Sequence, residues 1–182
     1  MILHIPHSST LLPDGFRVSP QSDLKQELQR MTDWFSDELF EIEDATRVVF
    51  ALSRLYCDVE RFRDDADEMM AQKGMGVCYE RDSFGNHFRE ISQEEKELIK
   101  VKHYDTHHKA FTDAVKEELK RVGEVLIVDC HSFSNEVLPH EKSGARADFC
   151  IGTDTFHTPD KLTQKAKLFL EQKGYSVAIN EP

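Results

Sequence analysis

The chain has 182 residues, enough for one domain with a buried core, and its formal net charge of −11 excludes the broad basic surface that binds nucleic-acid phosphates. No apolar run approaches the roughly 18 residues of a membrane helix, and the first residues lack the basic and apolar regions of a secretory signal. The four cysteines form no CxxC pair, so we expect a reduced, soluble, cytoplasmic chain rather than a cysteine zinc site.

The first half of the chain predicts two strands and a helix. Ile2 to Pro6 is a short apolar run that is typical of a buried strand. From Ser22 to Ile42 apolar residues recur at three- and four-residue steps, which predicts one helix. Val48 to Tyr56 is the next strand candidate. Residues 60–90 are rich in charge, Gly and Met, and we interpret them as an ordered excursion or a mobile loop.

A long helix and the clearest strand of the chain follow. Ser92 and Glu95 have the spacing of a capping box at the start of a helix that we expect to reach Arg121, just before Gly123. Glu124 to Asp129 is an apolar run of the type found in sheets that are covered on both faces.

The last part of the chain again alternates between strand and helix patterns. Phe149 to Gly152 predicts a short strand, and Tyr175 to Ile179 predicts the final one. Between them, Thr158 supplies an N-cap with Pro159 at the first helical position, and Gly174 closes that helix. We therefore expect a single α/β domain over the whole chain, a three-layer sandwich with a mostly parallel or mixed central sheet.

Two histidines directly follow predicted strands. In open α/β sheets, ligands bind outside the carboxyl ends of the strands. His7 follows the first strand and His131 follows the strongest one, each beside a serine. Turn capping is the favoured explanation for one such residue, whereas for two on separate strands turn capping and metal binding are about equally good explanations. A catalytic zinc ion has three protein ligands and an open position for the water that it activates.

The third ligand has to come from the carboxylates. Asp33 and Asp37 lie one turn apart on the predicted helix and can face one side of it, although a solvated helix face explains this spacing equally well. Asp58, at the end of the second predicted strand, and Asp129, two residues before His131, are the alternatives. Asp129 can instead hold a metal ligand in its orientation.

Arginine and histidine side chains extend this set. Arg54 and Arg61 bracket the stretch that follows the second predicted strand, and planar guanidinium groups bind carboxylates in a bidentate manner. Surface arginines are common, so the pattern alone is weak. His108 falls in line with the apolar residues of the long predicted helix, and so is either a satisfied core histidine or a polar group that lines the site.

A series of short motifs runs in order from residue 2 to about residue 152. It consists of Ile5-Pro6-His7-Ser8-Ser9-Thr10, Thr32-Asp33-Trp34 with Asp37 and Leu39, Ser53-Arg54-Leu55, Asp58-Val59-Glu60-Arg61-Phe62, Tyr104 and His108 ahead of Ala110, Asp129-Cys130-His131-Ser132, and Asp148 with Ile151-Gly152. Each motif is short, but the ordered set resembles the N-formylglutamate amidohydrolase family.

This resemblance implies a fold similar to that of zinc carboxypeptidases. It also implies one zinc ion bound by His7 and His131, with Asp33 as the third ligand. The implied reaction is attack of metal-activated water on a formyl carbonyl, with release of formate and a free amino acid, as in histidine degradation.

The resemblance also implies roles for other side chains. Arg54, Arg61 and Ser132 are then candidate ligands of a small anionic N-acyl amino acid, and His108 and Asp129 are candidate catalytic residues. Neither nucleic acid nor a membrane is expected as a partner.

Two features depart from the family pattern. Glu60 stands where the family usually has Asn, and a carboxylate there would repel an anionic substrate. Family members also run on beyond Pro182, into a region that supplies a catalytic glutamate. We therefore expect that this chain lacks the C-terminal part of the domain, and Glu181 at the terminus would be a poor general base.

Two other functions are compatible with the same residues. One is a related zinc deacylase or carboxypeptidase-like hydrolase with a different side-chain pocket. The other is a non-catalytic domain that keeps the fold and binds a metal ion or a ligand.

Overall fold

The computed structural model describes residues 1–135 and 146–181, and it divides the chain into two compact units, Met1–Ser134 and Asn135–Pro182. Each unit is described by itself, and the interpretation of the whole chain as a single domain stays a prediction. Among the described residues, no helix is both long and apolar enough to cross a membrane.

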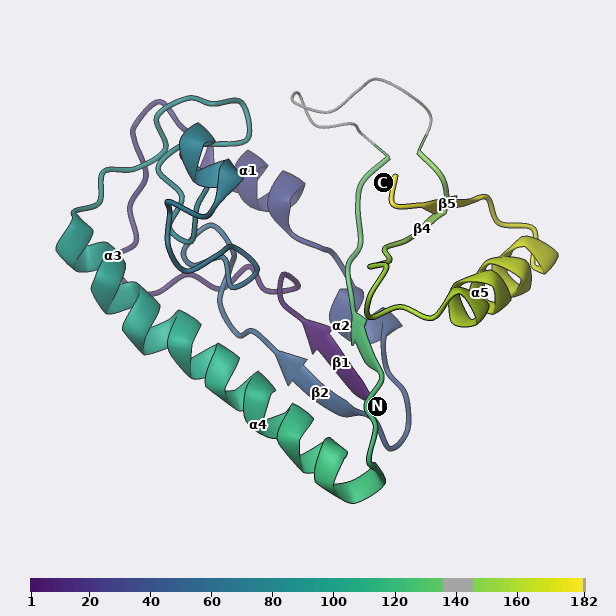
Figure 1. The fold of residues 1–182 in the computed structure, drawn as a ribbon. Helices are drawn as coiled ribbons and strands as arrows, with labels where there is room; N and C mark the ends of the chain where they lie inside the picture. Colours follow the sequence, from purple (N-terminus) through teal and green to yellow (C-terminus); the bar gives the residue numbers. More distant parts are fainter. Residues whose placement is uncertain (136–145, 182) are drawn as a thin grey trace. The chain divides into compact units, whose positions relative to one another are not determined.

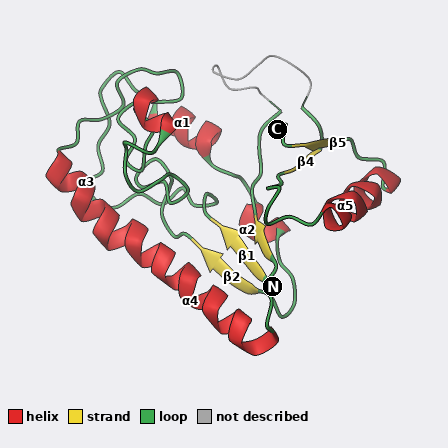
Figure 2. Cartoon of the chain, viewed as in Figure 1, coloured by secondary structure: helices red, strands yellow, loops and turns green. Residues whose placement is uncertain are grey.

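A three-stranded parallel sheet forms the centre of the first unit (Figures 1 and 2), in the order β2-β1-β3. β1 (Ile2–Ile5) lies between β2 (Thr46–Val49) and β3 (Ile127–Asp129) and pairs in parallel with both. All four residues of β1 are buried, as a central strand covered on both faces requires. The predicted strand at Ile2–Pro6 is therefore confirmed.

Helix α4 (Asp105–Val122) covers one face of this sheet, and Figure 1 shows it alongside β1 and β2. Leu3 and Ile5 point to the opposite face, since side chains alternate along a strand. There they pack with Phe40 and Ala45 in a buried apolar cluster. The predicted α/β class with a parallel sheet is thus confirmed in this unit, whereas the three-layer arrangement stays a prediction.

The single helix predicted over Ser22–Ile42 is wrong in its middle. The structure has two helices instead, α1 (Leu24–Met31) and the short α2 (Ser36–Leu39). Thr32 ends α1 in an extended conformation, with φ of −86° and ψ of 134°. The apolar periodicity of the sequence continues through this break, so the periodicity could not reveal the break.

The break between α1 and α2 brings a carboxylate to the end of β1. The backbone N–H of Asp33 donates to the carbonyl of His7 at 3.0 Å, in place of a helical hydrogen bond. Ser36 Oγ donates to the carbonyl of Asp33 at 2.9 Å, and Phe35 takes a left-handed φ of 62°. Tertiary hydrogen bonds therefore override the helical pattern here.

The second predicted strand begins earlier and ends sooner than expected. β2 ends at Val49, and the rest of the range expected to reach Tyr56 forms a turn in which the N–H of Tyr56 donates to the carbonyl of Ser53. Residues 60–90 form a packed excursion with a short 3-10 helix, η1 (Met69–Lys73). The excursion contributes several buried side chains, namely Met75, Val77, Tyr79 and Phe88.

The long predicted helix is confirmed, with one unexpected turn. The capping box is present, because Ser92 and Glu95 each accept a hydrogen bond from the other's backbone N–H. The helix runs through α3 (Gln93–Ile99), a π-helical turn η2 (Lys100–Tyr104) and α4, and ends at Gly123 with φ of 84°.

The second unit contains two parallel strands and a helix. β4 (Phe149–Ile151) pairs with β5 (Val177–Ile179), which confirms both predicted strands. Helix α5 (Asp160–Gln172) begins one residue later than predicted, since Pro159 occupies the N-cap position and Thr158 lies before it. The single central sheet that was expected is thus two parallel sheets in the described residues, one in each unit.

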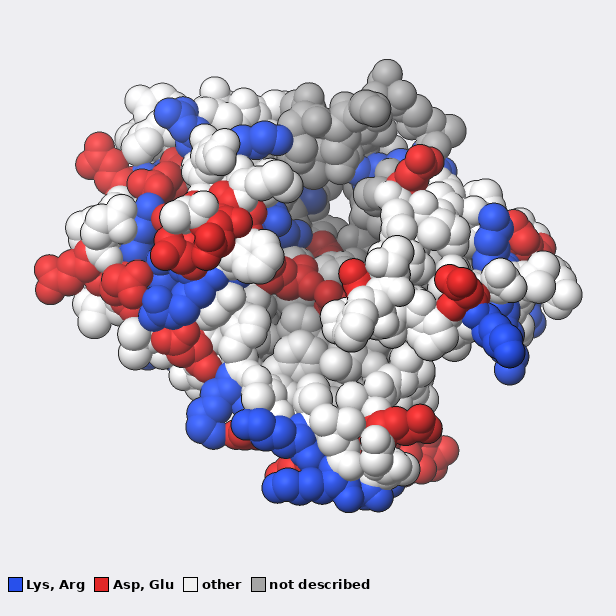
Figure 3. Space-filling model, in the orientation of Figure 1, with Lys and Arg blue, Asp and Glu red and all other residues white. Residues whose placement is uncertain are grey.

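Acidic and basic side chains are interspersed on the first unit. On the face drawn in Figure 3, Lys and Arg side chains lie among Asp and Glu side chains around the excursion and α3. The expectation, drawn from the net charge of −11, that nucleic acid is not a partner stays a prediction.

Candidate functional site

Both predicted histidine ligands lie at one edge of the three-stranded sheet. His7 follows β1 and His131 follows β3, and these two strands are parallel neighbours, so their carboxyl ends meet at the same edge. The two ring centroids are 5.4 Å apart. The structure therefore brings together two residues that are 124 positions apart in the sequence, that is, 131 − 7.

Asp58 holds the His7 ring from behind. His7 Nε2 lies 2.9 Å from Asp58 Oδ1, with His7 only 1% exposed and Asp58 fully buried. Because an ionised carboxylate only accepts, the hydrogen of this pair is carried by Nε2 of His7. His7 Nδ1 is buried without a hydrogen bond to any described residue, 3.3 Å from Glu60 Oε2 and 3.8 Å from Asp33 Oδ2.

Asp58 is surrounded by donors that keep it ionised. Arg54 donates to Asp58 Oδ2 from Nη2 at 3.0 Å and from Nε at 3.3 Å, the Tyr79 hydroxyl donates to it at 2.7 Å, and Arg61 Nε lies 3.4 Å away. Burial by itself raises the pKa of Asp58, but the charges of Arg54, His7 and Arg61 outweigh it and hold this pKa well below its usual value. Burial raises the pKa of Tyr79 to about 12, so its hydroxyl stays a donor.

His131 is held in the same way. Its Nδ1 lies 2.7 Å from Asp33 Oδ2, and its Nε2 lies 3.2 Å from Glu60 Oε1. Burial alone lowers the pKa of His131, but the nearby carboxylates of Asp129, Asp33 and Glu60 reverse this effect and raise it to about 12. These three carboxylates favour positive charge at the ring, whether it is carried by a proton or by a metal ion.

The backbone around Glu60 is fixed by the long helix. His108 Nε2 lies 2.8 Å from the carbonyl oxygen of Val59 and can donate to it, and the Tyr104 hydroxyl donates to the carbonyl of Arg61 at 2.8 Å. Tyr104 belongs to the π-helical turn, a feature that is frequent at functional sites. His108 is thus a satisfied histidine that contacts the Val59 backbone, and its predicted catalytic role stays a prediction.

The three residues that were predicted to bind the substrate differ in how many hydrogen bonds they already make within the protein. Arg54 is committed to Asp58 through two hydrogen bonds. Ser132 Oγ donates to the carbonyl of Trp34 at 2.8 Å, which ties the end of β3 to the turn after α1. Arg61 contacts Asp58 only through Nε, and 20% of its side chain is exposed. Arg61 is thus the predicted ligand that is most available to a substrate.

A third histidine lies beside the pair. His4 Nδ1 is 2.7 Å from Asp129 Oδ1, and His4 Nε2 is 2.8 Å from His107 Nε2. The other oxygen of Asp129 lies 3.7 Å from His131 Nε2. Burial, together with the nearby imidazoles of His4, His108 and His7, lowers the pKa of His107 to about 4. Sequence reasoning missed His4 and His107, although a histidine within the apolar run of β1 was a signal.

Two groups of side chains bring potential ligand atoms within 4.8 Å of one another. The first group consists of His7, Glu60 and His131. The second consists of His4, Glu60 and Asp129. The first group offers two imidazoles and one carboxylate, a known ligand set of catalytic zinc. Asp33, the predicted third ligand, lies behind the His131 ring, and the alternative Asp37 is exposed on α2 and belongs to neither group.

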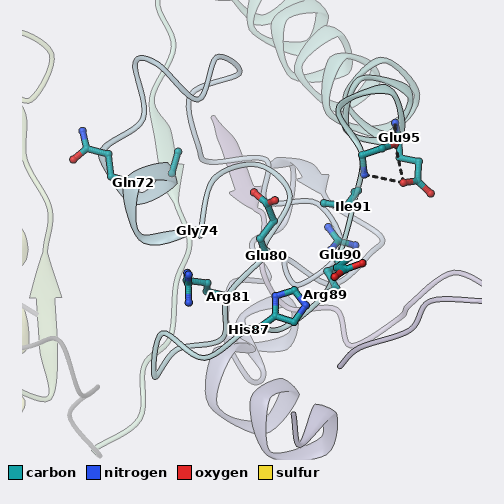
Figure 4. Close-up of a pocket in the computed structure, with 11 residues that line it drawn as sticks. Gln72, Gly74, Glu80, Arg81, His87, Arg89, Glu90, Ile91 and Glu95 are labelled. Carbon is teal, nitrogen blue, oxygen red and sulfur yellow. Dashed lines mark hydrogen bonds between the residues drawn. The ribbon is translucent and has the colours of Figure 1, made fainter. Parts of the chain in front are cut away.

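A separate hollow of about 730 Å³ lies within the excursion. Figure 4 shows Arg81 and His87 at one side of it and Glu95 at the other. Its lining includes none of the residues that surround the His7–His131 pair. The histidine site therefore remains the candidate centre of chemistry.

Comparisons with known proteins identify relatives of this chain. A family model described as N-formylglutamate amidohydrolase matches residues 1–182. The structure is similar to the crystal structure of N-formylglutamate amidohydrolase from Ralstonia eutropha JMP134, with a TM-score of 0.84 and 24% sequence identity over 100% of this chain and 72% of that chain. No curated protein matches the sequence. At 24% identity the structural likeness establishes the fold alone. The match to the family model extends over the whole chain and therefore establishes the family.

Proposed function

Because the chain belongs to the N-formylglutamate amidohydrolase family, we propose that it hydrolyses the formyl amide of N-formylglutamate or of a similar N-acyl amino acid. Water adds to the formyl carbon, the carbon–nitrogen bond breaks, the nitrogen gains a proton, and formate and the free amino acid leave. The observation that carries the proposal is the His7–His131 pair, in which each ring is held from behind by a carboxylate and directs its other nitrogen at Glu60.

One zinc ion bound by His7 Nδ1, His131 Nε2 and Glu60 is part of this proposal. Its main support is the buried Nδ1 of His7, which has no hydrogen bond to any described residue and faces the Glu60 carboxylate at 3.3 Å. Two histidines and one glutamate also bind zinc in carboxypeptidase A, which supports the predicted likeness to zinc carboxypeptidases. When bound, the ion supplies a Lewis acid that activates water and polarises the formyl carbonyl.

If Glu60 binds the zinc ion, its carboxylate no longer conflicts with an anionic substrate, which is the difficulty that the sequence raised. A free carboxylate in the substrate pocket would repel an anionic substrate, whereas a carboxylate bound to a cation is neutralised. Asp33 and Asp58 then orient His131 and His7 by fixing which ring nitrogen carries the hydrogen. Loss of such a supporting carboxylate typically weakens metal binding about 10–100-fold.

The remaining side chains bind and orient the substrate. Arg61 is the proposed partner of the substrate carboxylate, because its guanidinium is near the histidine pair and less committed than that of Arg54. Arg54 keeps Asp58 ionised and in place. Asp129 lies at the open side of the site with 53% of its side chain exposed, within reach of a bound substrate or water.

The direct test is formate release by the purified chain from N-formylglutamate. We expect activity that a chelator abolishes and zinc restores, with His7→Ala inactive and with His157→Ala, an exposed histidine of the second unit, as the matched control. A panel of N-acyl amino acids separates this function from that of a related deacylase. Preference for a substrate other than N-formylglutamate would favour the deacylase, and bound zinc without hydrolysis of any of them would favour a binding domain.

A further inference from the structure

We propose that Tyr79, a buried residue of the excursion, is a positioning residue that holds the Arg61 guanidinium where it binds the substrate carboxylate. The inference rests on the proposed function, because Arg61 is the proposed partner of that carboxylate. Tyr79 is fully buried, so its own hydroxyl does not touch the substrate. Tyr79 acts through the two groups beside it, the carboxylate of Asp58 and the guanidinium of Arg61.

The two carboxylate oxygens of Asp58 face different parts of the candidate site. Oδ1 lies 2.9 Å from Nε2 of His7 and accepts a hydrogen bond from the backbone N–H of Glu60 at 3.1 Å. Oδ2 accepts a hydrogen bond from the Tyr79 hydroxyl at 2.7 Å and lies 3.4 Å from Nε of Arg61. Tyr79 therefore belongs to the arginine side of this carboxylate, whereas the histidine side has contacts of its own.

The Arg61 side chain depends on its neighbours for its position. Its Nε is buried but forms no hydrogen bond to any described residue, although Asp58 Oδ2 lies 3.4 Å away. Burial lowers the pKa of Arg61, whereas Tyr79 and Asp58 beside the guanidinium raise it above its usual value. A long side chain that is already held in place loses less rotamer freedom when a ligand binds, and this strengthens binding.

The excursion fixes Tyr79 from the backbone side. Arg89, which is buried, donates from Nε to the carbonyl of Tyr79 at 2.8 Å and from Nη2 to the carbonyl of Tyr56 at 2.9 Å. Two residues before Tyr79, the carbonyl of Val77 accepts a hydrogen bond from the backbone N–H of Asp58 at 2.8 Å. The stretch that carries Tyr79 is thus bound to the stretch that carries Asp58, and the Tyr79 hydroxyl is a fixed contact for Arg61.

Tyr79→Phe separates this role from a general structural one. The variant keeps the buried ring and removes only the hydroxyl. Asp58 retains its two hydrogen bonds from Arg54 and its contact with His7. The His7 ring therefore stays in place and the chemical step should proceed as before. A higher KM with kcat nearly unchanged is the result expected when a contact made equally in the ground state and the transition state is lost.

The test compares steady-state formate release from N-formylglutamate by the wild type and its variants. Tyr79→Phe should raise the KM about tenfold and change kcat by less than about twofold. Arg61→Met should also raise the KM, and the double variant should raise it no further, because both changes act through one contact. Tyr56→Phe is the matched control, since it removes a partly buried tyrosine hydroxyl that forms no hydrogen bond to a described residue, and it should behave as the wild type does.

Two mono-amides of the substrate show whether the effect belongs to a carboxylate. N-formylglutamine lacks the side-chain carboxylate, and N-formylisoglutamine lacks the main-chain one. Tyr79→Phe should leave the KM unchanged for the amide that lacks the carboxylate bound by Arg61, and should raise it for the other. An equal increase for both amides, an increase that adds to that of Arg61→Met, or a wild-type KM for N-formylglutamate would overturn the inference.

A second variant reaches Tyr79 from its backbone. Arg89→Lys keeps the buried positive charge but replaces the planar fork that binds two carbonyls by a single nitrogen. It should raise the KM in the same direction as Tyr79→Phe, and it serves as the test if Tyr79→Phe does not fold. In that case an unchanged KM in Arg89→Lys would count against the positioning role.

Calorimetric titration with N-formylglutamate separates this inference from the proposed function, because binding requires no hydrolysis. If the wild type binds N-formylglutamate without releasing formate, the proposed function fails and the Kd decides the inference. A Kd about tenfold higher for Tyr79→Phe would then support the positioning role, and equal Kd values would overturn it. If the wild type neither binds nor hydrolyses N-formylglutamate, both fail.

Discussion

Asp58 is the residue on which the arrangement of the candidate site most depends. It is fully buried, it orients His7, and it receives hydrogen bonds from Arg54 and Tyr79. A buried carboxylate is tolerated only when it is paired and hydrogen-bonded. Arg54 therefore supports the orientation of His7 through Asp58, and the substrate binding predicted for it from the sequence motif stays a prediction.

Replacement of Arg54 by methionine should be strongly destabilising, because it leaves the buried Asp58 charge without its main partner. Removing one member of a buried ion pair typically costs about 3–5 kcal/mol of unfolding free energy. The control is Arg63→Met, whose partner Asp105 is exposed, and an exposed pair contributes about 1 kcal/mol or less. Urea unfolding of both variants measures the difference, and equal losses would show that Asp58 does not need Arg54.

Residues differ in how far the sequence could identify them. His7 and His131 could be predicted because each directly follows an apolar strand, where ligands of parallel sheets lie. Glu60 could not, since its position depends on hydrogen bonds from Tyr104 and His108, more than 40 positions away, to its neighbouring carbonyls. His4 was missed because its partnership with Asp129 depends on the register of two strands.

At the level of elements, the irregular segments are those that serve the site. The break between α1 and α2 brings Asp33 to His131, and the π-helical turn η2 carries Tyr104 toward the Glu60 loop. The capping box, the long helix and most strands could be predicted, because local sequence determines them. The break and the π-helical turn could not, since long-range hydrogen bonds decide them.

Removal of the Tyr104 hydroxyl tests whether the π-helical turn positions Glu60. Tyr104→Phe keeps the ring and loses the hydrogen bond to the carbonyl of Arg61, which should cost only about 1 kcal/mol of stability. Zinc should nevertheless dissociate faster, because the Glu60 backbone loses one of its two anchors. Tyr175→Phe in the second unit is the control. Zinc release as slow as that of the wild type would limit Tyr104 to a structural role.

At the scale of the whole molecule, the family and the α/β class were both readable from the sequence. The ordered motifs resembled the N-formylglutamate amidohydrolase family, and the match over residues 1–182 confirms it. The parallel strand order is confirmed within each unit. The division into two sheets was not predicted, because strand patterns do not reveal which strands pair.

Zinc should stabilise the folded first unit, since its proposed ligands come from three separate stretches of this unit and only the folded state assembles them. A ligand at about 100 times its Kd adds roughly 2.7 kcal/mol to the unfolding free energy. We therefore expect a chelator to lower the Tm of the wild type and of His157→Ala, but to leave that of His131→Ala unchanged. An equal decrease in all three proteins would contradict a site at His131.

The central claim is that Glu60, rather than Asp33, completes the metal site with His7 and His131. Zinc affinity of Glu60→Gln and Asp33→Asn, measured by competition with a chromogenic chelator, tests it most directly. Asp33→Asn keeps an oxygen that can accept the hydrogen bond from His131 Nδ1, so its affinity should fall by at most about 10–100-fold. Glu60→Gln should fall further, because an anionic ligand is lost. Tighter zinc binding by Glu60→Gln than by Asp33→Asn would contradict the account.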